Sequence, residues 1–132
     1  MDTTMVKKSP MERFAATNPT CEIWWDSSPL VFDSWSKKTI AETPVEKRAQ
    51  VAAWHARYYI CDKPLEQLFR GVTTNPPLSW AAVGDCPAFW REWAIEEKRK
   101  NPKVKAHEVW WKMYREIVRR GAEKYFGVFN RS

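Results

Sequence analysis

The sequence has little cysteine and glycine, and it contains no long apolar run. The three cysteines, Cys21, Cys61 and Cys86, lack the paired CxxC spacing of a zinc knuckle or a disulfide framework. No 18 consecutive residues are apolar, and residues 1–10 hold no apolar stretch, so neither a membrane span nor a secretion signal is expected. Four glycines and an apolar fraction of 44% argue against collagen-like repeats and disorder. We therefore expect a soluble, cytoplasmic protein with reduced thiols.

Tryptophan and basic residues are abundant by contrast. Nine tryptophans are more large rings than one small core usually holds, so either the core is unusually aromatic or some rings meet a partner. The net charge of +6 is unevenly spread, because residues 98–131 carry 11 basic and three acidic side chains. Such a surface can attract phosphate groups, although a solvated helix face is the more ordinary explanation.

Two short strands separated by helices are expected. Residues 1–20 are predicted to form a flexible N-terminal lead that ends in a turn at Asn18-Pro19. The apolar and aromatic run at 21–26 predicts a buried strand, and the β-branched run Gly71–Asn75 predicts a second. About 45 residues of helical sequence join them, as in parallel α/β sheets. The expected fold class is therefore α/β with parallel strands and many helices.

The helices are predicted from proline, capping residues and apolar spacing. A capping box of Thr43 and Glu46 predicts one helix start, followed by an apolar stripe from Val45 to Ile60. The other expected helices cover 29–36, 65–69 and 85–101, and a final helix bends at Gly121.

Polar residues stand where both predicted strands end. Asp26 ends the first strand and Asn75 the second, with Thr73 on the same strand face as Asn75. The carboxyl ends of parallel strands share one edge of the sheet, so these side chains are expected to converge at a binding crevice. The alternative is that Asp26 caps the following helix and Asn75 only shapes the Pro76-Pro77 turn.

Two segments resemble the transaldolase family. Residues 71–79, GVTTNPPLS, are similar to the family's second-strand signature, a TTNP or TSNP turn followed by a small and an aliphatic residue. Residues 22–28, EIWWDSS, resemble its first strand, which ends in an aspartate followed by small residues. The resemblance implies a (β/α)8 TIM barrel of sugar-phosphate (pentose phosphate) metabolism, which transfers a dihydroxyacetone unit through a lysine Schiff base.

The resemblance also implies roles for three residues. Asp26 would be the acid/base, Asn75 would hold hydroxyls of the donor sugar, and Thr73 would line the pocket. No metal or organic cofactor is expected, because the lysine itself serves as electron sink. That lysine lies on a later strand in the family, and none of the 12 lysines here stands in an apolar strand where desolvation would activate it. We therefore expect this chain alone to be inactive.

The resemblance implies that this chain is shorter than the whole barrel. A TIM barrel needs about 250 residues, so residues 21–132 would form the N-terminal part of a partial barrel, its first two strands and their helices. A longer parent gene, a second chain or self-association could supply the rest. Sugar phosphate is the expected substrate, no membrane partner is expected, and nucleic acid is not favoured. The alternative function is a non-catalytic basic helical module that binds nucleic acid or a protein.

His55 and His107-Glu108 lack metal-ligand spacing, so no metal site is expected.

Overall fold

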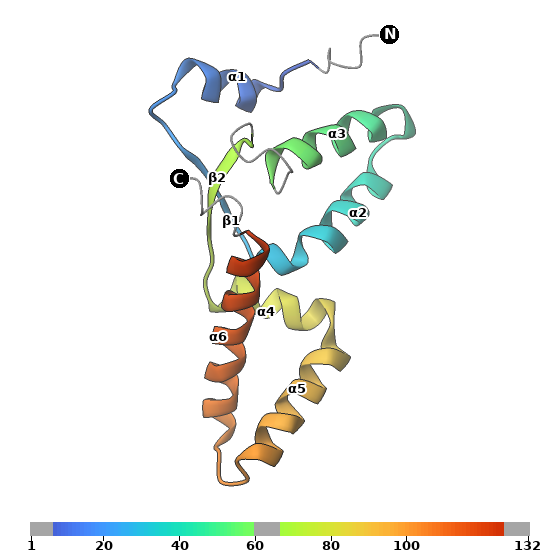
Figure 1. The fold of residues 1–132 in the computed structure, drawn as a ribbon. Coiled ribbons are helices and arrows are strands. Elements are labelled where there is room, and N and C mark those ends of the chain that lie inside the picture. The colour runs from blue at the N-terminus through green and yellow to red at the C-terminus, as the bar shows by residue number, and fades with distance from the viewer. Residues whose placement is uncertain (1–6, 60–66, 126–132) are drawn as a thin grey trace.

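The computed structural model describes residues 7–59 and 67–125, and Figure 1 shows their arrangement. Short 3-10 helices, η1 and η2, precede two of the α-helices. In chain order the elements are α1 (Pro10–Thr17), β1 (Ile23–Asp26), η1 (Pro29–Val31), α2 (Phe32–Glu42), η2 (Val45–Lys47), α3 (Arg48–Tyr58), β2 (Phe69–Thr73), α4 (Pro76–Asp85), α5 (Pro87–Lys100) and α6 (Ala106–Lys124). The architecture is mixed α/β and rich in helix.

The two strands pair in parallel, as the sequence predicts, and form a two-stranded sheet. Asp26 stands opposite Thr73 at the carboxyl end of the ladder, and Ile23 stands opposite Phe69 at the other end. The register shifts between Ile23 and Trp24, because Trp24 pairs with Gly71 and leaves Arg70 as an extra residue. Such a bulge re-aims the side chains beyond it.

One face of the sheet packs on an aromatic cluster from α2 and α3. The rings of Trp25, Phe32 and Phe69 each lie 4.9 to 6.0 Å from another ring of the cluster, and Tyr59 is the common neighbour. Edge-to-face and tilted pairs at such distances add to the gain from burial. The other face carries Trp24 and Asp26, which are exposed.

A second core lies between α4, α5 and α6, in the lower half of Figure 1. Its buried members are Ala82, Trp90, Met113 and Ile117, and Leu30 and Val31 of the η1 segment pack against them. Gly121 of α6 lies so close to η1 that an added Cβ would stand 3.1 Å from Pro29 Cδ. Close packing, and not the predicted bend, explains this glycine, since α6 continues to Lys124.

The expected flexible lead contains a helix. Ser9 caps α1, because its Oγ accepts a hydrogen bond from the Glu12 amide while the Glu12 carboxylate accepts one from the Ser9 amide. Arg57 of α3 donates two hydrogen bonds to the same carboxylate, at 2.7 and 3.0 Å. The prediction was wrong for residues 10–17, because a capping box and a partly buried ion pair hold this segment.

The predicted capping box at Thr43 and Glu46 is absent. The Thr43 hydroxyl instead donates to the Thr39 carbonyl at the end of α2, so the next α-helix begins only at Arg48. Val45, expected on the buried stripe, is 73% exposed. The end of that stripe at Ile60 lies outside the described residues.

Two helices near β2 also differ from expectation. Phe69 was expected to end a short helix from Leu65, but it begins β2, where its ring packs against Tyr59. The rest of that expected helix is largely outside the described residues. Helix α4 is not expected from the sequence, because Pro76-Pro77 predicts only a turn. Prolines are tolerated in the first helical turn, where the amide hydrogens have no helical partner.

Candidate functional site

The site begins with a hydrogen bond across the carboxyl ends of the two strands. The Thr73 hydroxyl donates to Asp26 Oδ1 over 2.8 Å. Both residues are exposed and lie opposite each other in the ladder. The predicted convergence of Asp26 and Thr73 is therefore present. Asp26 does not cap the following helix, because Ser28 occupies the N-cap position of η1 and makes no side-chain bond there.

Asn75 lies two residues beyond Thr73 and caps α4. Its Oδ1 accepts a hydrogen bond from the Leu78 amide over 2.9 Å. Beside it, the hydroxyls of Thr74 and Ser79 are 3.0 Å apart, and Ser79 is buried. The carboxamide NH2 of Asn75 has no hydrogen bond among the described residues. The cap holds Asn75 at the carboxyl end of β2 and leaves two donors for a ligand.

The capping role predicts a graded effect on stability. Asn75→Ala is expected to lower the free energy of unfolding by about 1 kcal/mol, because the Leu78 amide loses its acceptor. Asn75→Ser keeps an acceptor and is expected to cost much less. Urea unfolding of the two variants measures the difference. Equal losses in both variants would show that the cap contributes nothing.

Trp24 occupies the same sheet face as Asp26 and Thr73. Its indole lies over Gly71, where an added Cβ would stand 2.6 Å from the ring. The indole Nε1 donates to Glu22, and the side chain is 54% exposed. Parallel sheets are normally covered on both faces. This face therefore combines an apolar ring with the polar groups at its carboxyl end and is uncovered by the described part of the chain.

No described lysine lies on either strand. The described lysines stand on residues flanking α1, on helices, or in the α5–α6 connection. Within residues 7–59 and 67–125, no group of three His, Cys, Asp or Glu residues could hold a metal ion. The site thus offers a carboxylate, a hydroxyl and a carboxamide. They can hold sugar hydroxyls and move a proton.

A separate hollow lies at the amino ends of the strands. It has a volume of about 350 Å³, and Lys8, Glu12, Cys21 and Arg70 are among its lining residues. Burial raises the pKa of Glu12, but hydrogen bonds from Arg57 and Ser9 outweigh it and hold the pKa below its ordinary value. Glu12 is therefore a charged structural partner of Arg57. This hollow is at the opposite end of the sheet from Asp26.

The two histidines have no metal-binding partners among the described residues. His55 is buried, stacks on Trp35 at 5.0 Å and places Nδ1 2.7 Å from the Ser36 hydroxyl. Burial lowers its pKa, so the neutral ring is favoured in the aromatic cluster. His107 is exposed on α6. Cys21 and Cys86 are free and exposed, and Cys61 lies outside the described residues.

Comparisons with known proteins identify no relative. No family model, no curated protein and no solved structure matches the chain. In the part of the chain that the structure describes, no helix is long and apolar enough to cross a membrane. The arrangement at the carboxyl ends of β1 and β2 is thus the basis for a functional assignment.

Proposed function

We propose that the chain is the N-terminal part of a transaldolase-like (β/α)8 barrel. In the complete protein, this barrel would transfer a dihydroxyacetone unit between sugar phosphates. The observation that carries the proposal is the 2.8 Å hydrogen bond from Thr73 to Asp26 across the carboxyl ends of two parallel strands. These residues belong to the two segments that resemble the family.

The uncovered sheet face supports the same proposal. In a barrel, one sheet face packs against outer helices and the other faces the interior. Trp25 and Phe69 face the helices here, whereas Trp24, Asp26 and Thr73 lie on the opposite face. Further strands would bury the half-exposed ring of Trp24 and leave the carboxyl-end polar groups at the mouth of the barrel.

The chemistry divides between this part and the remainder. Asp26 would accept a proton from a donor-sugar hydroxyl as the carbon–carbon bond breaks, and it would return the proton when the new bond forms. The Asn75 carboxamide would hold hydroxyls of the same sugar. The lysine that forms the Schiff base would come from a later strand, supplied by a longer gene, a second chain or a second copy.

Borohydride trapping tests this division of labour. With fructose 6-phosphate, the described chain alone is expected to give no reduced adduct, because it places no lysine in an apolar strand. The same chain joined to the product of the adjoining reading frame is expected to give one adduct, on a lysine of the added part. Mass spectrometry locates the modified residue.

Three results would contradict the proposal. The first is an adduct on a lysine of this chain, and the second is the absence of any adduct from the completed protein. The third is a combination: no adjoining frame encodes a lysine-bearing apolar strand, and the self-associated chain gives no adduct either. Lysine modification by acetic anhydride before trapping serves as the control, since it must abolish the adduct.

A further inference from the structure

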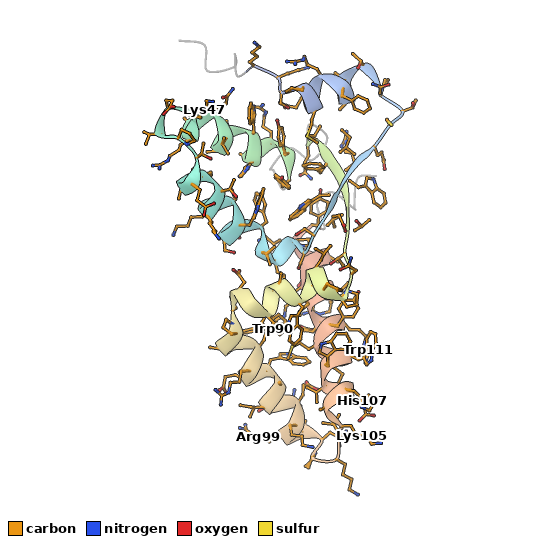
Figure 2. The ribbon with its side chains drawn as sticks, turned by 180° about the vertical axis from the view of Figure 1, so that it is seen from behind. Lys47, Trp90, Arg99, Lys105, His107 and Trp111 are labelled. Atoms are coloured by element: carbon orange, nitrogen blue, oxygen red, sulfur yellow. The ribbon has the colours of Figure 1, made fainter. Side chains whose placement is uncertain are left out.

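We propose that the α5–α6 hairpin carries a surface for single-stranded nucleic acid. The hairpin projects away from the strands, and Figure 2 shows Arg99, Lys105 and His107 near its outer end. Residues 98–105 contain five basic and no acidic side chains. This surface is distinct from the sugar-phosphate site and does not depend on the proposed barrel.

The tip of the hairpin, residues 98–105, has a fixed backbone shape. Val104 is buried, and its amide donates to the Asn101 carbonyl over 3.0 Å. Lys98 closes the connection by donating from Nζ to the Val104 carbonyl over 2.8 Å. Lys103 and Lys105 flank Val104 and are exposed. The backbone that carries Lys103 and Lys105 is therefore fixed, and both side chains start from the end of a folded hairpin.

Ion pairs compensate many, but not all, of the basic side chains of the hairpin. Toward its outer end, Arg99 pairs with Glu96 at 2.8 Å, and Lys100 and Lys112 lie 3.9 and 3.5 Å from Glu97. Near the strands, Arg119, Arg120 and Lys124 pair with Glu116, Glu123 or Asp33 at 2.8 to 3.3 Å. Among the described residues, Lys103, Lys105 and Arg115 have no such partner. Glu108, the acidic residue nearest the tip on α6, accepts a hydrogen bond from the Lys105 amide. Lys103, Lys105 and Arg115 therefore carry positive charge that no ion pair among the described residues compensates, and such charge attracts phosphates.

Exposed aromatic rings lie next to these basic residues on α6. Trp111 is 50% exposed and lies one helical turn from His107 and one from Arg115, so the three share a face of α6. Trp110 contacts Trp111 at 4.7 Å and Trp80 of α4 at 6.4 Å, and Trp80 is 48% exposed. Every base has a π-face that can stack on such rings, whereas a purely charged partner would gain nothing from them.

The combination favours single-stranded nucleic acid over other polyanions. Cations track its phosphates and exposed tryptophans stack its unpaired bases. The proposal departs from the expectation that nucleic acid is not a favoured partner. Trp90, which is only 3% exposed, is a core residue and has no part in it.

Fluorescence anisotropy with labelled oligothymidylate and oligouridylate of about 12 nucleotides tests the proposal. The chain is expected to bind at low salt with a linear loss of log affinity against log salt. Lys103→Gln/Lys105→Gln is expected to make that slope less negative by about 1.4, since each phosphate contact on a single strand contributes about 0.7. Trp111→Ala is expected to weaken binding by about 5- to 150-fold.

The control is Lys37→Gln/Lys47→Gln, which removes two exposed lysines from the α2–α3 region. It is expected to leave the affinity and the slope unchanged. Failure to bind either oligonucleotide would overturn the proposal. Equal losses of affinity in the Lys103→Gln/Lys105→Gln variant and in the control variant would also overturn it. So would the combination of undiminished binding by Trp111→Ala and an affinity of the unaltered chain for polyglutamate equal to that for the oligonucleotides. Preferential binding to anionic vesicles would overturn it in favour of a lipid surface.

Discussion

Asp26→Asn is expected to lower the rate of dihydroxyacetone transfer by the completed barrel by about 10²- to 10⁴-fold, the usual contribution of a positioned acid/base. The amide has nearly the same shape but cannot take up the hydroxyl proton as the carbon–carbon bond breaks. Release of glyceraldehyde 3-phosphate from fructose 6-phosphate, with an aldose phosphate as acceptor, measures the rate.

Thr73→Val is the matched comparison for this variant. Valine keeps the branched shape that suits a strand and removes only the hydroxyl that donates to Asp26 over 2.8 Å. A smaller loss of rate is expected, because the carboxylate remains and loses only its orienting partner. If Asp26→Asn retained the full rate in a folded, completed protein, Asp26 would not be the acid/base.

The largest stability effect is expected at Ile117. Its side chain is 1% exposed and packs in the core formed by α4, α5 and α6. Ile117→Ala is expected to lower the free energy of unfolding by about 2–5 kcal/mol, since it removes buried methyl groups and leaves a cavity. Urea unfolding followed by tryptophan fluorescence measures the loss.

Val118→Ala is the control for this effect, because Val118 is the next residue on α6 and is 36% exposed. A much smaller loss is expected there. Similar losses at both positions would mean that burial in this core does not determine the effect, since alanine has a higher helix propensity than either residue it replaces. That result would contradict the described packing of α6 against α4 and α5.

The parallel pairing and the meeting of Asp26 with Thr73 could be predicted from the sequence. A long helical connection between two apolar runs is typical of parallel strands, and parallel pairing brings their carboxyl ends together. For Asn75, the sequence leaves two alternatives, a site residue or a residue that only shapes the following turn. The two uses are compatible, since its Oδ1 caps α4 and its NH2 remains available.

The failures arose where local signals compete with tertiary contacts. The Ser9-to-Glu12 capping box was present in the sequence, but the partner that fixes it, Arg57, is 45 residues away from Glu12. At Thr43 the opposite happened, since the hydroxyl bonds backward to α2 and the expected helix start moves to Arg48. Spacing alone cannot tell which of two nearby carbonyl or amide groups a short polar side chain will meet.

The surface on the α5–α6 hairpin could not be predicted from the sequence either. A count of charges in residues 98–131 cannot separate paired from unpaired cations, and helical spacing does not reveal that Trp111 remains half exposed while Trp90 is buried. The structure supplies the distinction, because Arg99, Lys100, Lys112, Arg119, Arg120 and Lys124 are ion-paired, whereas Lys103, Lys105 and Arg115 have no ion-pair partner among the described residues.

The central claim is that Asp26, Thr73 and Asn75 form part of a sugar-phosphate site, and the crystal structure of the borohydride-trapped, completed protein tests it most directly. The account predicts that the trapped three-carbon unit lies within hydrogen-bond reach, about 2.6–3.2 Å, of the Asp26 carboxylate and the Asn75 carboxamide. A trapped unit elsewhere, with both side chains still facing solvent, would contradict it.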